Sequence, residues 1–249
     1  GHYGFDEVHI DLRRLAASAG ARYYRDEVTG IDRAARHVLC RHRPPVSYDA
    51  LSINIGSTPR LDGVPGAAEH AVPVKPIRRF NERWLALHER VCEHAGATTI
   101  AVVGAGAAGV ELTLAMQFRL RQELVRRGRN PDELRFHLYS AEARILPTHN
   151  ASVRGAFESV LAQRGVKLHL DAEVSRVETG RLQTRQGEVL EADEIVWVTQ
   201  AGGAPWLAGT GLALDESGFI RVGDTLQTET DPLIFAAGAG FLVLLLWQR

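Results

Sequence analysis

The chain is poor in cysteine, and this shortage excludes several classes of site. Its 249 residues hold two cysteines, Cys40 and Cys92, which lie far apart and in no CxxC spacing. That disfavours a disulfide scaffold, a zinc site and an adjacent redox dithiol. The ten histidines show no HxxxH or HExxH spacing, so we expect no metal site. There is no GxSxG elbow, and no catalytic nucleophile is nominated.

Net charge and long apolar runs are also lacking. The formal net charge is −1, so electrostatics give no case for a nucleic-acid partner or an anionic membrane. The run Gly240–Trp247 is too short to cross a bilayer, which takes roughly 20 residues; it is either a buried terminal element or a tail foreign to the protein. No initiator methionine or secretory leader is visible at the start. We therefore expect a chain cut at its front and a cytoplasmic location.

A glycine-rich turn in residues 98–116 (TTIAVVGAGAAGVELTLAM) is the most informative feature. An apolar strand, Ile100–Val103, leads into the turn and a helix-forming stretch follows it. The turn consists of Gly104, Ala105, Gly106, Ala107, Ala108 and Gly109. Strand, turn and helix together are typical of a dinucleotide-binding fingerprint, in which free amides at the helix start face a pyrophosphate. The alternative is a tight packing turn between a strand and a helix.

The rest of the chain alternates short strands with helices, which predicts an α/β fold with a parallel sheet and one inserted β-ribbon. The composition, 45% hydrophobic and 24% charged, is that of an ordinary globular protein with one large or two modest domains. Predicted helices cover 5–19, 77–95, 153–164 and the segment after the fingerprint, where the helix is extended through 119–134. Predicted strands cover 21–24, 27–32, 37–40, 48–55, 100–103, 135–140, 166–170 and 195–199. Residues 173–184 and 189–191 form a strand pair that turns at Gly180 and Gly187.

Four segments resemble the pyridine nucleotide–disulfide oxidoreductase superfamily. They are YDALSINIGSTP at 48–59, VVGAGAAGVE at 102–111, EADEIVWVTQAGGAPWL at 191–207 and LQTETDPLIFAAG at 226–238. Within it the chain is similar to the type II NADH dehydrogenase branch, and more narrowly to the flavoprotein module that precedes selenide, water dikinase in some fusion proteins. Residues 1–16, 72–80 and 211–222 carry the narrower likeness.

The resemblance implies a fold with two dinucleotide-binding domains, Rossmann-like with a parallel sheet plus a β-meander. Residues 1–78 and 204–249 would be pieces of an FAD domain, and 79–203 the inserted NAD(P)-binding domain. FAD and NAD(P)H would be the cofactors. The family's first glycine fingerprint would precede Gly1, so we expect the FAD domain to be incomplete. Gly238, which would approach the flavin, is followed by Ala239 where the family shows aspartate.

The resemblance also nominates residues on the nicotinamide side. Glu111 would lie near the nicotinamide, unless it is a plain surface glutamate. Ser140 stands where NAD-preferring members carry an acidic residue for the ribose 2′-hydroxyl. Arg144 could pair with a 2′-phosphate, whereas Glu142 argues against this, so the choice between NADH and NADPH stays open. Thr199 ends a strand beside the same domain, with Gln200 in place of the usual glycine.

On the flavin side, Asn54, Ile55, Gly56 and Ser57 resemble a strand end that passes close to FAD, although a plain strand-terminating turn would read the same. Val28 matches a position whose backbone meets the adenine, although a lone valine is usually core. Lys75 is a candidate polar contact, although a solvated lysine is the simpler interpretation.

The function that follows from the resemblance is hydride transfer from NAD(P)H to FAD. The electron acceptor is unknown; selenium reduction, with a fused selenophosphate synthase domain as partner, is one hypothesis. Two alternatives remain open: a nicotinamide-nucleotide-binding module without turnover, and a structural remnant without cofactor. No cysteine pair is present for direct disulfide reduction.

Overall fold

The computed structural model describes residues 7, 9–61, 63–94, 96–199 and 201–238, and the backbone of 241–242. The chain forms two compact units: unit 1 is Pro59–Gln200, and unit 2 consists of Tyr3–Thr58 with Ala201–Arg249. The chain passes between them twice, near β5 (Thr58–Pro59) and β14 (Ala201–Gly202). Among the described residues, no helix combines the length and the apolar character needed to span a membrane.

The domain boundaries differ from those expected. Residues 59–78 were assigned to the first flanking piece, but they lie in unit 1. The reason is that β6 (Val72–Pro73) pairs in parallel with β13 (Glu194–Trp197) as an edge of the sheet. Residues 201–203, expected in the inserted domain, lie in unit 2.

Unit 1 is built on a five-stranded parallel sheet, which confirms the predicted α/β class. Its strand order is β6-β13-β7-β8-β9, with β7 at Thr98–Val103, β8 at Leu134–Tyr139 and β9 at Lys167–His169. The central strand β7 pairs with β13 on one side and β8 on the other. All four residues Ile100–Val103 are buried, as parallel strands covered on both faces require.

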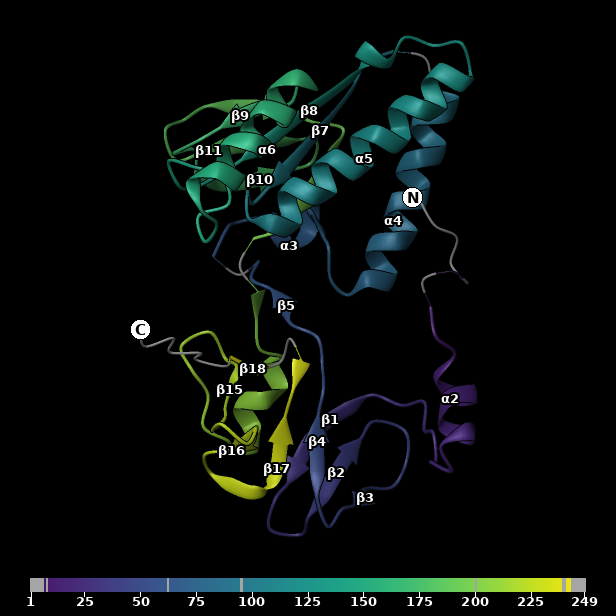
Figure 1. Cartoon of the computed structure of the whole chain (residues 1–249), viewed down its shortest axis with the longest axis vertical. Coiled ribbons are helices and arrows are strands. Elements are labelled where there is room, and N and C mark those ends of the chain that lie inside the picture. Colours follow the sequence, from purple (N-terminus) through teal and green to yellow (C-terminus); the bar gives the residue numbers. More distant parts are fainter. Residues whose placement is uncertain are drawn as a thin grey trace. The chain divides into compact units, whose positions relative to one another are not determined.

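Alternate residues of β7 point into two different cores. Ile100 and Val102 pack in the first core, to which three helices contribute: α4 (Ile77–Glu93), α5 (Ala107–Arg126) and α6 (Ala151–Gln163). The α5 residues in this core include Val110, Met116, Leu120 and Leu124, at helical spacing. Figure 1 shows these helices beside the sheet.

The opposite face of the sheet is covered by an antiparallel ribbon. Ala101 and Val103 pack with β10 (Val174–Glu178) and β11 (Arg181–Thr184), and with the short helix α3 (Ala67–His70). β12 (Val189–Glu191) completes the ribbon. The expected turns at Gly180 and Gly187 are confirmed, because both adopt positive φ, +72° and +90°.

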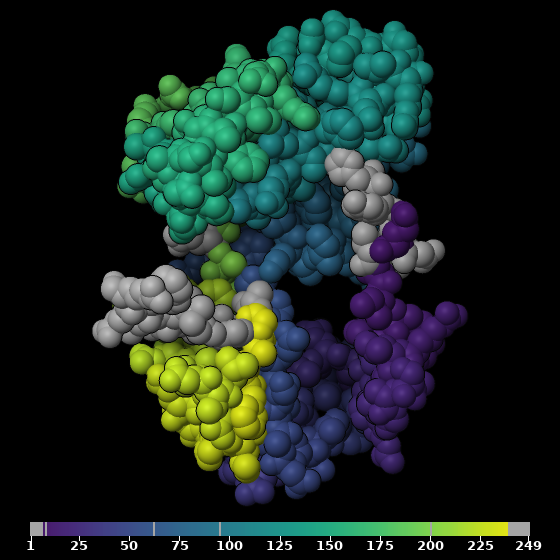
Figure 2. Space-filling view, viewed as in Figure 1, coloured from purple at the N-terminus to yellow at the C-terminus, as the bar shows by residue number. Residues whose placement is uncertain are grey.

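Unit 2 contains two three-stranded sheets around a third core. β1 (Val28–Asp32), β2 (His37–Cys40) and β3 (Val46–Ser47) form the predicted antiparallel meander. β4 (Leu51–Ile53) pairs in parallel with β17 (Asp231–Ala236), and β16 (Gln227–Thr228) pairs with β17. Figure 2 shows the yellow-green C-terminal segment against the blue residues of this unit. Remaining elements are α2 (Leu12–Ser18), η2 (Pro205–Thr210), β15 (Ile220–Arg221) and β18 (Phe241–Leu242), with η1 (Pro131–Glu133) in unit 1.

Some expected elements differ. Residues 21–24 form no strand. The helix expected over 5–19 is confirmed for α2 alone, because residues 9–11 are not helical and Asp11 is the N-cap. Residues 5, 6 and 8 lie outside the described residues. Of the apolar tail, Phe241–Leu242 pairs with β15, and 239–240 and 243–249 lie outside the described residues.

Candidate functional site: a phosphate-binding turn

Two glycines of the fingerprint are required by packing within unit 1. Gly104 adopts a φ of +113°, and a Cβ there would lie 2.6 Å from the Val198 carbonyl oxygen. A Cβ at Gly109 would lie 1.8 Å from the Gly104 carbonyl oxygen. Both contacts are far shorter than van der Waals distance, so any side chain would displace the backbone. These glycines allow α5 to approach the ends of β7 and β13.

Gly106 is different, because nothing in the protein requires a glycine there. Its φ and ψ are −71° and −177°, values that any residue adopts. A Cβ at this position would meet no atom within 4 Å, and residues 106–108 are exposed. The missing side chain therefore leaves open space beside the backbone, as a close approach by a bound molecule requires.

The start of α5 has the features of an anion site. Gly106 is the N-cap residue, no side chain caps the helix, and its first turn holds no acidic residue. The first amides of a helix have no partner within the helix and carry a partial positive charge. Uncapped amides beside open space fit a phosphate group. The residues present therefore fit the pyrophosphate of a dinucleotide.

The loop after β8 is anchored to this turn. The amide of Leu146 donates to the carbonyl of Ala105 at 2.8 Å. At the base of the loop, Ser140 is 6% exposed, and its hydroxyl donates to the Arg144 carbonyl at 3.2 Å and accepts from the Glu142 amide at 3.1 Å. Ser140 therefore shapes the loop, while Glu142 and Arg144 are exposed on it. The predicted cofactor roles of Ser140 and Arg144 stay predictions.

The other nicotinamide-side candidates lie on the same unit. Glu111 is exposed on α5. Thr199 follows β13, and its neighbour Val198 lies against Gly104. The Thr199 hydroxyl donates to the Arg60 carbonyl at 3.5 Å. Gln200 lies outside the described residues. The structure thus brings together the fingerprint turn, the loop after β8 and the end of β13.

In unit 2, the flavin-side candidates follow the carboxyl ends of two neighbouring parallel strands. The amide of Ala237 donates to the carbonyl of Ile53 at 2.8 Å. Gly238 has a φ of +84°, and a Cβ there would lie 2.1 Å from Oδ1 of Asn54. Ligands of α/β sheets bind at such strand ends. The structure therefore brings Asn54 and Gly238 together.

Around Gly56 the backbone is open: a Cβ there would meet no atom within 4 Å. Ile55 packs against the core of unit 2 and Ser57 is 9% exposed. Val28 begins β1 in the other sheet of the unit and pairs with Cys40. Lys75 lies in unit 1, between β6 and α4. The predicted flavin contacts of Lys75 and Val28 stay predictions.

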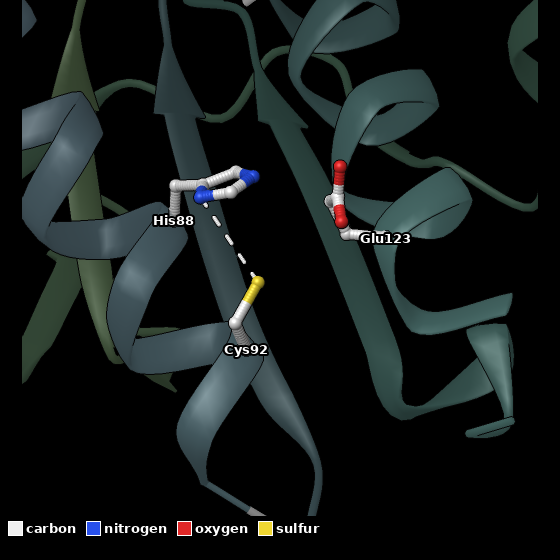
Figure 3. A group of neighbouring side chains, drawn as sticks. All are labelled: His88, Cys92 and Glu123. Carbon is white, nitrogen blue, oxygen red and sulfur yellow. Dashed lines mark hydrogen bonds between the residues drawn. The ribbon is translucent and has the colours of Figure 1, made fainter. Parts of the chain in front are cut away.

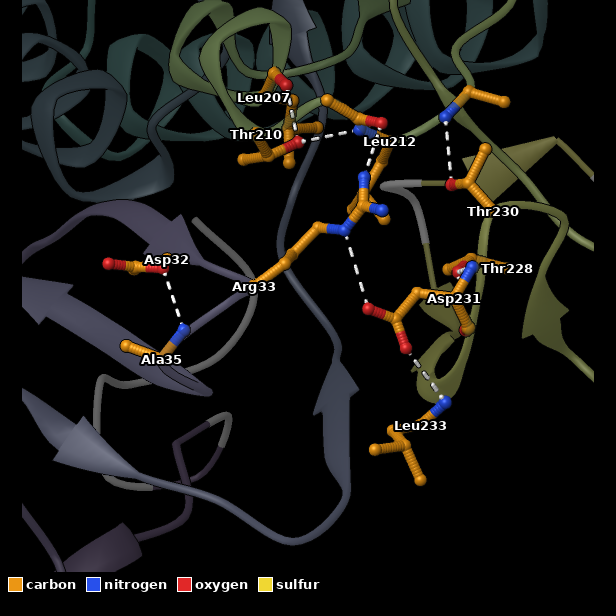
Figure 4. A network of polar contacts seen from close by, with 12 residues as sticks. Asp32, Arg33, Ala35, Leu207, Thr210, Leu212, Thr228, Thr230, Asp231 and Leu233 are labelled. Atoms are coloured by element: carbon orange, nitrogen blue, oxygen red, sulfur yellow. Dashed lines mark hydrogen bonds and ion pairs between the residues drawn. The ribbon is translucent and has the colours of Figure 1, made fainter.

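An ion pair missed by the sequence analysis holds β17 in unit 2 (Figure 4). Nε of Arg33 lies 3.3 Å from Oδ2 of Asp231, the first residue of β17, and Nη1 donates to the Gly211 carbonyl at 2.5 Å. Oδ1 of Asp231 accepts from the Leu233 amide at 3.0 Å. The two chain segments of unit 2 are thereby joined. No sequence spacing signals a pair 198 residues apart.

A second unforeseen cluster lies on the parallel pair β8 and β9. Nδ1 of His137 lies 3.0 Å from Nε2 of His169, and the His169 ring stacks on Tyr139 with centroids 4.2 Å apart. Burial, with a smaller contribution from the neighbouring His169, lowers the pKa of His137 to about 4. Burial likewise raises the pKa of Tyr139 to about 12. Both groups are therefore neutral at pH 7.

Comparison with known proteins decides the family. A family model described as pyridine nucleotide-disulphide oxidoreductase matches residues 11–248. The chain belongs to this family. The membership confirms the broader resemblance found in the sequence, and the α/β fold class with it.

Two curated relatives illustrate the likeness. An NADH dehydrogenase-like protein of Mycobacterium tuberculosis is 29% identical over 92% of this chain and 57% of its own length. The type II NADH:quinone oxidoreductase of Haemophilus influenzae is 28% identical over 81% of this chain and 50% of its own length. The chain thus spans about half the length of these relatives.

Several solved structures share this fold. The NDH2 structure from Plasmodium falciparum, in complex with NADH, superposes with a TM-score of 0.75 at 17% identity, over 89% of this chain and 50% of that one. A water-forming NADPH oxidase bound to NADPH superposes with a TM-score of 0.72 at 23% identity, over 92% of this chain and 49% of that one. The predicted NAD(P)H agrees with the pyridine nucleotide named in the family's description.

Proposed function

We propose that this chain is the nucleotide-binding part of an FAD-dependent NAD(P)H oxidoreductase of the NADH dehydrogenase-like branch. The observation that carries the proposal is the turn at Gly106, where an uncapped helix start meets a glycine that packing does not require. The family match over 11–248 supports the same assignment.

Within unit 1 each candidate has a distinct task. The amides of Ala107 and Ala108 hold the pyrophosphate, and Gly106 lets it approach. Arg144 and Glu142, exposed on the loop after β8, contact the adenosine ribose and its 2′ substituent. Glu111 and Thr199 orient the nicotinamide end. The protein supplies binding and orientation, because the redox chemistry belongs to the cofactors.

In unit 2, the strand-end segments 54–57 and 237–238 are the flavin-facing surface, since they follow neighbouring parallel strands. The Ala237 amide donates to the Ile53 carbonyl and holds these two segments beside each other, and the Asn54 side chain leaves no room for a Cβ at Gly238. When bound, the two cofactors would supply hydride transfer, which is two electrons and one proton, from the nicotinamide to the flavin.

For the electron acceptor we propose a quinone, by analogy with the H. influenzae quinone oxidoreductase. The narrower likeness of 1–16, 72–80 and 211–222 to the flavoprotein module before selenide, water dikinase supports a second acceptor, an oxidised selenium compound, with a fused selenophosphate synthase domain as partner. Purified protein supplied with FAD and NADH would be assayed with menadione and with selenite in parallel. NADH oxidation that depends on one of the two assigns the acceptor.

A binding module without turnover is the competing function. It is favoured by unit 1, which has a complete five-stranded sheet with a core on each face. The deciding experiment records the visible spectrum of the purified protein and titrates it with NADH and NADPH by calorimetry. A flavin spectrum that NADH bleaches supports the oxidoreductase; nucleotide binding without flavin supports the module. No binding of either cofactor would refute both.

A further inference from the structure

Three side chains with metal-binding atoms meet between α4 and α5, away from the phosphate-binding turn. His88 and Cys92 lie one helical turn apart on α4, and Glu123 faces them from α5 (Figure 3). One ligand atom of each lies within 4.8 Å of the other two. Because Glu123 is 16 residues after the start of α5, this cluster lies roughly 24 Å along the helix from the turn.

His88 and Cys92 are nearly in position to bind the same metal ion. Nδ1 of His88 lies 4.0 Å from Sγ of Cys92, and in a tetrahedral zinc site the two atoms would be about 3.6 Å apart. Cys92 is 8% exposed. Nε2 of His88 is buried and has no hydrogen-bond partner, although buried polar atoms are normally satisfied. A zinc ion bound to Nδ1 would not pair with Nε2, because the two ring nitrogens point in different directions, so the geometry of Nδ1, the Cys92 sulfur and Glu123 carries the site.

Two arginines hold one carboxylate oxygen of Glu123 and leave the other oxygen available for a metal ion. Its side chain is 12% exposed, and Oε1 lies 2.9 Å from Nη2 of Arg119 and 3.0 Å from Nη1 of Arg126. None of the ion pairs formed by the described residues uses Oε2. Carboxylates that bind metals are commonly oriented by such hydrogen bonds to their other oxygen.

We propose that His88, Cys92 and Glu123 bind a zinc ion, with water as the fourth ligand. A thiolate, an imidazole and a carboxylate form a donor set that suits Zn²⁺ rather than Mg²⁺ or Ca²⁺. The site would join α4 to α5. The nearby guanidinium groups of Arg119 and Arg126 repel a cation, so we expect weaker binding than in a cysteine-rich structural site.

This site departs from the expectation of no metal. The sequence analysis considered spacings among histidines and among cysteines, whereas this site mixes one of each at a helical spacing of four. The third ligand comes from a different helix, 31 residues beyond Cys92.

The test is metal binding by the whole chain, stripped with a chelator and titrated with Zn²⁺ and then with Co²⁺ as a spectroscopic probe. We expect one equivalent of zinc, and a near-ultraviolet sulfur-to-cobalt charge-transfer band that zinc displaces. Cys92→Ser should abolish the band and weaken zinc binding at least about tenfold. Glu123→Gln should weaken zinc binding similarly while keeping the band. Cys40→Ser is the matched control, and it should change neither the cobalt band nor the zinc affinity.

Circular dichroism melts of each variant separate lost binding from lost folding, and Glu123→Gln keeps the buried thiol and ring in place. If Cys92→Ser does not fold, the wild-type cobalt spectrum and Glu123→Gln still decide. Absence of a sulfur-to-cobalt band in the wild type would overturn the proposal. So would unchanged zinc affinity in Glu123→Gln, or loss of binding in Cys40→Ser.

Discussion

Replacing Gly106 by threonine tests the phosphate-binding turn directly, because nucleotide affinity should fall while the stability of the protein stays nearly unchanged. Backbone angles of −71° and −177° suit threonine, and a Cβ would meet no protein atom within 4 Å. Threonine is about as good an N-cap residue as glycine. The free energy of unfolding should therefore change by less than about 0.5 kcal/mol.

Nucleotide affinity should fall, for two reasons. The new side chain fills the space through which the pyrophosphate approaches, and its hydroxyl can accept the α5 amides that would bind phosphate. Crowding a well-fitted contact costs about 1–3 kcal/mol, which corresponds to about 5- to 150-fold in the dissociation constant.

The assay is calorimetric titration of NADH and NADPH into wild type and Gly106→Thr, with urea unfolding of both proteins in parallel. Gly155→Thr on α6 is the control: Gly155 is exposed and also has open space at its Cβ position, so nucleotide affinity should not change. Unchanged affinity in Gly106→Thr would refute the assignment of the turn. A loss of affinity equal in the control would also refute it.

Three further predictions concern stability. Gly109→Ala should lower the free energy of unfolding by at least about 1–3 kcal/mol, because its Cβ would lie 1.8 Å from the Gly104 carbonyl oxygen; urea unfolding checks this, and a neutral effect would contradict the packing role. The pKa of His137 is lowered from 6.5 to about 4 in the folded protein. Below pH 6.5 the unfolded chain therefore binds more protons than the folded chain, and the free energy of unfolding should fall by about 2 kcal/mol between pH 6.5 and 4. Calorimetric melts should show a flatter pH dependence of stability in His137→Phe than in the wild type. Arg33→Met should destabilise unit 2 by about 1–2 kcal/mol, seen as faster amide exchange in β17, and unchanged exchange would argue against the ion pair.

The sequence alone predicted the elements whose signals are local. The sequence predicted the strand that ends at Val103, the turn and the following helix. These elements were found because an apolar run, the glycines and a stretch of helix-forming residues are adjacent in the chain. The ribbon turns at Gly180 and Gly187 were found for the same reason, since positive φ selects glycine. Boundaries were less accurate: the segment from Arg119 to Leu134 was expected to extend the helix, but α5 ends at Arg126 and a 3₁₀ turn follows.

What the sequence could not predict depends on the order of strands and the packing of helices. The contact between His137 and His169 exists because β8 and β9 are neighbours in parallel register, and no local spacing reports that. Ser140 was nominated from its position after a strand, but only the structure shows that its hydroxyl is engaged within the loop. Residues 59–78 were misplaced because β6 joins the sheet through two residues with no periodic pattern.

The anchoring of the loop after β8 has a practical consequence for altering coenzyme preference. Because Ser140 and the Leu146 amide fasten both ends of the loop, residues 141–144 form an interchangeable tip on a fixed base. If these residues face the ribose 2′ position as proposed, substitutions at Glu142 and Arg144 would change the charge presented to a 2′-phosphate without moving the glycine turn. An engineer who replaced Ser140 as well would lose that independence, because the base and the tip would then change together.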